Sequence, residues 1–221
     1  MTDGEWLRDA AESYDTVADN YTDFVRPAIE RDPMLRGALA LFAEYVRDGG
    51  GPVADVGCGP GFMTAHLSDL GLDAFGIDLS PGMIEIARRN RPDLSFEVGS
   101  MTELALADGS VGAVLASWSV IHVPDEEIPT VFAHFHRVLR PGGVALIGFH
   151  VGDRSKIKTE GYGGLPMRIP LYHRPMDRMA SWLRAAGFAV EFELIENPGP
   201  APTAGMVLAR RPVIDGSSSA R

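Results

Sequence analysis

Three glycines stand at every second position in the stretch VADVGCGPGF, residues 53–62. The four residues before the first glycine read as a short buried strand, and residues 62–70 carry the pattern of a helix. A glycine-rich turn between a strand and a helix lets the backbone approach a ligand closely, because glycine lacks Cβ. One glycine would satisfy a tight turn, so the trio of Gly57, Gly59 and Gly61 favours a ligand-binding loop.

The rest of the chain alternates strand and helix patterns in the same way. This alternation predicts an α/β fold in three layers, with a mostly parallel sheet between two layers of helices. Ligands of such sheets lie beyond the carboxyl ends of the strands, next to turns like the one described above. Further strands are expected at residues 73–80, 94–100, 112–123, 144–150, 189–195 and 205–211.

The sequence pattern divides the chain into three parts. Residues 1–50 show apolar positions at helical spacing, and residues 51–212 hold the predicted sheet. Within the second part, residues 151–175 form an unusually long connection rich in apolar and aromatic side chains, which is typical of a functional segment. Residues 213–221 are small and polar, so a disordered tail is expected there.

Composition and charge limit the classes of partner. The formal net charge of −10 argues against a nucleic-acid partner, which needs a basic surface. No apolar run reaches the length of about 18–20 residues that spans a bilayer, and the acidic N-terminus lacks a signal sequence. Cys58 is the only cysteine, which leaves no cysteine cluster for a metal. We therefore expect a cytoplasmic protein, monomeric or homodimeric, that binds no membrane, nucleic acid or metal.

The glycine spacing and two acids indicate the kind of ligand. Neither the dinucleotide fingerprint G-x-G-x-x-G nor a P-loop fits the loop, so the ligand should lack phosphates. Asp78 ends the second predicted strand, where an acid can accept hydrogen bonds from both hydroxyls of a ribose. Asp55 is an acid in an apolar strand, and a ligand with a cationic or amino group would give it a partner. S-adenosylmethionine (SAM) has all these properties.

Four stretches, in this order along the chain, resemble a known family. They are VADVGCGPG, GIDLSPGMI, GSMTELALADGSVGAVLASWSVIHV and RVLRPGGVALIGF. They are similar to the SAM-dependent methyltransferases with a seven-stranded Rossmann-like fold, above all the methyltransferase-domain group that acts on small molecules. The resemblance implies the sheet order 3-2-1-4-5-7-6 with strand 7 antiparallel, and an N-terminal helical lid over the cofactor.

The resemblance also implies a set of cofactor contacts. The glycine loop would line the methionine part of SAM, and the acid in the first strand would lie near its amino group. The acid after the second strand would hold the ribose, and the residues that follow would flank the adenine. Ser100 departs from the family pattern, because many relatives carry Asp near this position. The residues placed at the cofactor are Tyr14, Tyr21, Asp55, Gly57, Cys58, Gly59, Asp78, Leu79, Met83, Ser100, Met101 and Ser117.

Methyl transfer from SAM requires alignment of the acceptor and, for some acceptors, removal of a proton. His122 and His150 follow the fourth and fifth predicted strands, and an ordinary histidine pKa of about 6.5 suits a base at neutral pH. The apolar stretch 151–175 implies a small, largely apolar acceptor, with oxygen favoured over nitrogen or carbon as the methylated atom and S-adenosylhomocysteine (SAH) as product. Two alternatives stay open: non-methyl chemistry on SAM by a cyclase, decarboxylase or hydroxylase, and SAM binding without turnover.

Overall fold

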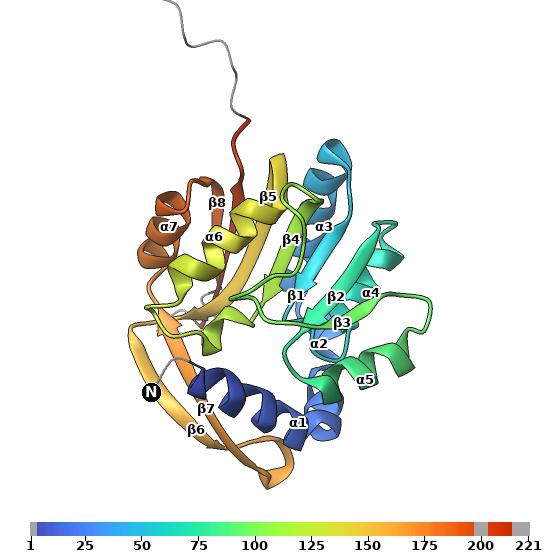
Figure 1. Ribbon diagram of the computed structural model, residues 1–221, viewed down its shortest axis with the longest axis vertical. Coiled ribbons are helices and arrows are strands. Elements are labelled where there is room, and N and C mark those ends of the chain that lie inside the picture. The colour runs from blue at the N-terminus through green and yellow to red at the C-terminus, as the bar shows by residue number, and fades with distance from the viewer. Residues whose placement is uncertain (1–3, 197–202, 214–221) are drawn as a thin grey trace, which may run out of the picture.

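The computed structural model describes residues 4–196 and 203–213, and one twisted sheet lies at its centre (Figure 1). Five strands run parallel in the order β3-β2-β1-β4-β5. β9 lies antiparallel beside β5, and β8 pairs antiparallel with β9. The bounds are β1 Val53–Val56, β2 Ala74–Asp78, β3 Phe96–Val98, β4 Val111–Ser117, β5 Leu139–Val151, β8 Ala189–Glu196 and β9 Ala204–Arg210.

The predicted fold is confirmed once a hairpin is set apart from these seven strands. The hairpin consists of β6 (Arg154–Glu160) and β7 (Pro166–Arg174), which pair antiparallel within the long connection between β5 and the next helix. β7 also pairs in parallel with the last two residues of β5, beyond the end of β4. Without the hairpin, β8 and β9 are the sixth and seventh strands, and the order is 3-2-1-4-5-7-6 with the seventh antiparallel.

Helices cover both faces of the sheet, as the alternation of patterns predicted. Side chains of α3 and α4 pack with β1, β4 and β5 on one face. Side chains of α6 and α7 pack with the other face of β4 and β5. α5 lies beside β2 and β3, where its apolar side chains meet Phe96. The bounds are α3 Pro33–Gly49, α4 Phe62–Asp69, α5 Pro81–Asn90, α6 Ile128–Val138 and α7 Met176–Ala185.

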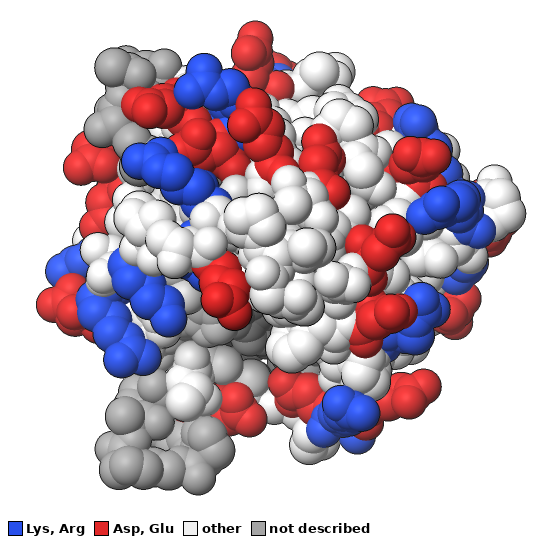
Figure 2. Space-filling view, turned by 90° about the horizontal axis from the view of Figure 1, so that it is seen from below, with Lys and Arg blue, Asp and Glu red and all other residues white. Residues whose placement is uncertain are grey.

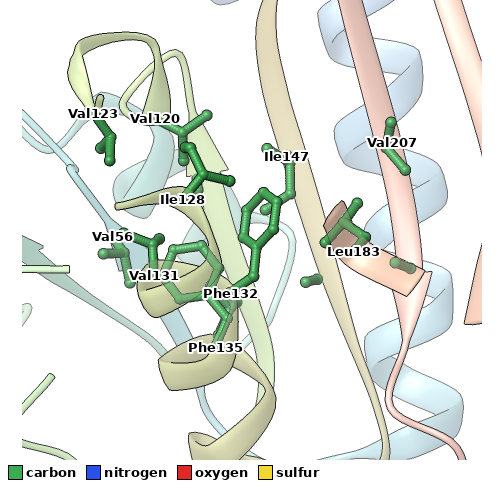
Figure 3. Packing of buried hydrophobic residues seen from close by; sticks show 14 of the residues in the cluster. Val56, Val120, Val123, Ile128, Val131, Phe132, Phe135, Ile147, Leu183 and Val207 are labelled. Atoms are coloured by element: carbon green, nitrogen blue, oxygen red, sulfur yellow. The ribbon is translucent and has the colours of Figure 1, made fainter. Parts of the chain in front are cut away.

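The largest apolar cluster lies between α6 and the sheet (Figure 3). Val131, Phe132 and Phe135 on α6 are fully buried, because their spacing of one, three and four residues keeps them on the side that meets β4 and β5. Burial of each such side chain stabilises the fold by about 1.5–3 kcal/mol. Val120 and Val123, in the loop after β4, belong to the same cluster. Apolar packing in the core therefore holds this loop in place.

The first helix, α1 (Glu5–Val25), lies across the carboxyl ends of the strands (Figure 1). Its buried positions follow helical spacing, from Trp6 through Ala10 to Val17. Ala10 and Val17 pack against β7, and Ala18 packs against α5 on the other side, whereas Trp6 joins the cluster between α6 and the sheet. Within residues 1–50, α1 thus lies over the sheet end, whereas α3 is part of a helical layer. The short α2 (Ala28–Arg31) joins the two helices.

The lower end of the molecule in Figure 1 is formed by α1 and the hairpin. Seen from below, it has a broad area of uncharged residues, with acidic and basic side chains around it (Figure 2). Among the described residues, no helix combines the length and the apolar character that crossing a membrane requires. Apart from Val213, the tail predicted at residues 213–221 lies outside the described part of the chain.

Candidate functional site

A cavity opens between α1 and the carboxyl ends of β1, β2 and β4, where the sequence placed the ligand. It encloses about 730 Å³, counting the space open to solvent at its mouth. Among the described residues that line it, Asp78 alone is an acid, and none is a lysine or an arginine. Eleven of the residues predicted for the site line it: Tyr14, Tyr21, Gly57, Gly59, Asp78, Leu79, Met83, Ser100, Met101, Ser117 and His122.

The carboxylate of Asp78 is held at the cavity wall by two backbone amides. The Gly59 N–H donates to Oδ2 at 2.7 Å, and the Ser80 N–H donates to Oδ1 at 2.9 Å. Burial raises the pKa of Asp78, and these two hydrogen bonds oppose the rise. Each carboxylate oxygen has a second lone pair, so the group can accept further hydrogen bonds from a ligand while it stays bound to the backbone.

The three glycines serve different purposes in this structure. All three have positive φ, at 79°, 53° and 82°. A Cβ on Gly57 would lie 2.2 Å from Cβ of Ser119, and one on Gly61 would lie 2.9 Å from the Phe96 ring, so these two glycines permit close packing. Gly59 faces the cavity, where an added Cβ would lie 3.5 Å from the Tyr21 ring, and there the backbone itself forms the wall.

Asp55 does not line the cavity. Because neighbouring residues of a strand face opposite sides, Val56 reaches the cavity while Asp55 turns toward α4. There its Oδ2 accepts a hydrogen bond of 2.7 Å from the Thr64 hydroxyl, whereas Oδ1 is buried without a partner among the described residues. Burial, opposed by the Thr64 bond, raises the pKa of Asp55 to about 7.

We expect Asp55 to make the stability of the fold depend on pH. The folded chain keeps the Asp55 proton up to about pH 7, whereas the unfolded chain releases it near pH 3.8, so stability falls as the pH rises between these values. Asn has no proton to release in this range, so Asp55→Asn does not lose stability in this way as the pH rises. Its free energy of unfolding relative to wild type should therefore rise by about 2 kcal/mol between pH 5.5 and 8, measured by urea denaturation.

The matched control is Asp93→Asn, because Arg91 lowers the pKa of Asp93 and that carboxyl is ionised over this whole pH range. The difference between this control and wild type should stay level from pH 5.5 to 8. A level difference for Asp55→Asn as well would contradict a raised pKa at Asp55.

His122 joins α1 to β7 across the cavity wall. The carbonyl oxygen of Pro170 lies 2.7 Å from Nδ1 and can only accept, so Nδ1 carries a proton. Nε2 of the neutral ring then accepts from the Tyr14 hydroxyl at 2.7 Å. Burial raises the pKa of Tyr14, which keeps the proton on that hydroxyl. The Tyr14 ring also packs edge-on against Tyr21, at 5.3 Å between centroids.

The electrostatics of His122 differ from the sequence-based expectation. Burial lowers its pKa to about 4, despite the opposing hydrogen bond to Pro170, so the ring is neutral at pH 7 without any change in protonation near pH 6.5. Its Nε2 does not face the cavity directly, because the Tyr14 hydroxyl lies on it. A proton from a ligand in the cavity would therefore reach His122 through Tyr14.

The structure does not bring His150 or Cys58 to the cavity. The His150 ring stacks on His173 at 5.1 Å between centroids, where β5 and β7 pair. The Cys58 side chain turns into the apolar cluster of α5 and β3. Both side chains therefore lie outside the wall that the other predicted residues share.

Sequence reasoning missed part of the wall that α1 provides. Trp6, Leu7, Ala10 and Ala11 line the cavity together with Ser80, Ser119 and Val123. Trp6 and Ala10 lie on the same helical stripe as Tyr14 and Tyr21, so the stripe itself was the signal that could have found them. Trp118 also lines the cavity and has φ of 51°, the positive value that non-glycine residues rarely adopt. Such strain is frequent at functional sites.

Comparisons with known proteins agree with this geometry. Residues 53–143 match the family described as "Methyltransferase domain". Demethylmenaquinone methyltransferase of Renibacterium salmoninarum is 31% identical over 144 residues, which cover 63% of this chain and 57% of the relative. Malonyl-[acyl-carrier protein] O-methyltransferase of Serratia marcescens is 30% identical over 137 residues, which cover 62% and 48%. The chain thus spans about half the length of these curated relatives.

A solved structure is similar over nearly the whole chain. The crystal structure of 1,6-didemethyltoxoflavin-N1-methyltransferase from Burkholderia thailandensis, with bound 1,6-didemethyltoxoflavin and SAH, superposes with a TM-score of 0.75. The similarity covers 96% of this chain and 92% of that one, at 19% sequence identity. At this identity the likeness establishes the shared fold.

Proposed function

We propose that the protein is a SAM-dependent enzyme that methylates a small, largely apolar acceptor, on the premise that residues 53–143 match the methyltransferase-domain family. The observation that carries the proposal is the cavity with Asp78 at its wall. A carboxylate fixed by two backbone amides suits ribose hydroxyls, and a described lining without lysine or arginine suits a nucleoside without phosphates.

The residues around Asp78 fit such a cofactor. Leu79 and Met83 provide apolar surface for an adenine ring, and the Ser100 hydroxyl, which contacts the Thr102 hydroxyl at 2.7 Å, offers a polar group at its edge. Gly59 and the rings of Tyr14 and Tyr21 also line the cavity, and the Tyr21 ring lies beside Gly59. When bound there, SAM would supply an electrophilic methyl group with its own leaving group.

The chain's own residues would orient the acceptor and remove a proton. Trp6, Trp118 and Val123 surround the remaining space with apolar surface, which excludes water and favours a planar or aliphatic acceptor. The Tyr14 hydroxyl is one of the polar groups of the cavity. As an acceptor hydroxyl gives its proton to the Tyr14 oxygen, the Tyr14 proton passes to Nε2 of His122, and the Pro170 carbonyl stabilises the resulting charge through Nδ1–H. This path supports oxygen as the methylated atom, and it gives His150 no role.

The test is an acceptor screen that reads SAH release. Purified protein, SAM and a panel of small phenols, hydroxylated heterocycles, amines and carboxylates are incubated together, and each product is identified by mass. We expect release of one SAH per methylated product, with uncharged hydroxyl compounds as the best acceptors. Product formed from SAM without SAH would favour non-methyl chemistry, and SAM binding with no product in any class would favour a binding role.

A further inference from the structure

On the face of α1 that meets α5, the carboxylate of Asp15 contacts the N-terminus of α5. Oδ1 of Asp15 accepts hydrogen bonds from the Ser80 hydroxyl at 2.5 Å and from the Gly82 N–H at 2.9 Å. Both donors belong to the N-terminus of α5, which begins at Pro81. The acid of one helix therefore binds the positive end of another, 65 residues away in the sequence.

The contact of Asp15 with Ser80 lies next to the proposed cofactor site. Ser80 donates its N–H to Asp78 and its hydroxyl to Asp15, so it lies between the two carboxylates. Its hydroxyl oxygen also accepts from the Met83 N–H, which caps α5. Burial is the main cause of the raised pKa of Asp78, and the negative charge of Asp15 adds to it. Asp15 therefore influences the pKa of Asp78, although Asp15 does not line the cavity.

Gly82 shows that this close approach is built into the sequence. A Cβ at Gly82 would lie 3.0 Å from Asp15 Oδ1 and 3.5 Å from Asp15 Cα. The backbone of Gly82 does not have the positive φ that would otherwise explain glycine. A side chain at Gly82 would therefore crowd Asp15 Oδ1 and shift it by a few tenths of an ångström.

The other side of α1 is fixed to the hairpin. The Ser13 hydroxyl accepts a hydrogen bond from the Arg168 N–H at 2.8 Å, and the Arg168 side chain pairs with Asp9. Val17 packs there with Met167 and Ile169, whereas Ala18 packs with Met83 and Ile86 on the α5 side. On the α5 side, Asp15 makes two of the polar contacts that hold α1 in place.

We propose that Asp15 is a positioning residue that latches α1 over the cofactor, so that SAM enters and leaves only when the contact of Asp15 with Ser80 and Gly82 opens. The inference rests on the proposed function. Tyr14 precedes Asp15 on the same helix, so the closed latch also brings the Tyr14 hydroxyl to His122. Cofactor retention and the position of the proton path thus depend on one contact.

The experiment measures both rate constants for SAM. Association is followed by stopped-flow fluorescence, with Trp6 and Trp118 in the cavity wall as reporters, and dissociation by chasing radiolabelled SAM with unlabelled SAM. We expect Asp15→Ala and Gly82→Ala to speed dissociation at least tenfold. Both should also speed association severalfold, because the closed helix must open before SAM enters. A merely structural role would not speed association.

Two further variants test whether the change in rates is specific to the contact of Asp15. Asp19→Ala removes an acid one turn later on α1, whose ion pair with Arg89 is 3.8 Å long and exposed, and should leave both rates within twofold of wild type. Asp15→Asn keeps an acceptor oxygen and should lie between wild type and Asp15→Ala. Hydrogen exchange of the α1 amides, measured without cofactor, should rise in Asp15→Ala and Gly82→Ala alone.

The outcomes separate the two claims. A wild-type chain that does not bind SAM overturns the proposed function, and the latch with it. A wild-type chain that binds SAM, with unchanged rates and unchanged α1 exchange in Asp15→Ala and Gly82→Ala, overturns the latch and leaves the proposed function standing.

Discussion

Asp78→Ala is expected to weaken SAM binding by about 1.5–3 kcal/mol, which is about a tenfold to more than hundredfold rise in Kd. The carboxylate lies at the cavity wall with both oxygens already oriented by the Gly59 and Ser80 amides. It therefore offers ribose hydroxyls two charge-assisted hydrogen bonds without further ordering of the side chain. Isothermal titration with SAM measures the change.

Two other variants identify the cause of that loss. Asp78→Asn keeps the shape but loses the charge and one acceptor, so its affinity should be intermediate. Asp73→Ala removes an exposed acid just before β2, at the end remote from the cavity, and should bind SAM like wild type. Wild-type affinity in Asp78→Ala, with thermal unfolding unchanged, would mean that Asp78 only orders the loop between β2 and α5.

His122→Ala should lower turnover of a hydroxyl acceptor by about 10²–10⁴-fold, the usual contribution of a positioned base. SAM affinity should change little, because the proposed proton path places His122 on the acceptor side, in contact with Tyr14. The burial-lowered pKa of about 4 leaves the ring neutral above about pH 5, so the wild-type rate should be level from pH 5.5 to 8. Single-turnover measurements of SAH formation at each pH give these rates.

Tyr14→Phe is the matched variant for the proton path. It keeps the ring that packs on Tyr21 but removes the hydroxyl that lies on Nε2. If the two residues act as one unit, Tyr14→Phe should cost about as much as His122→Ala, and the double variant should cost little more than either. Full activity in both single variants would assign catalysis to proximity and orientation, as for an acceptor that is already ionised.

The sequence predicted those parts of the site that depend on local order along the chain. Asp78 was found because it ends a buried strand and precedes the cap formed by Ser80, and both signals lie within three residues. The sheet order was implied by the resemblance to a known family that four motifs carry. The hairpin lies in the long connection, whose stretch MRIPLYH has an extended character in the sequence, but the sequence did not predict the pairing of β6 with β7.

The sequence did not predict contacts between segments that lie far apart along the chain. His122 was predicted as a base with an ordinary pKa, but its burial and its bonds to Tyr14 and Pro170 join residues 108 and 48 positions apart. Asp55 was predicted near the ligand because it is an acid in a buried strand. A strand buried on both faces carries no alternation of polarity, so the sequence does not say which face Asp55 takes.

The most direct test of the account is the titration of the wild-type chain with SAM, with NADH as the competing dinucleotide. We expect a saturable heat with one site for SAM and none for NADH, because the described wall of the cavity has the Asp78 carboxylate but no lysine or arginine for a pyrophosphate. Saturable binding of NADH without any binding of SAM would contradict it.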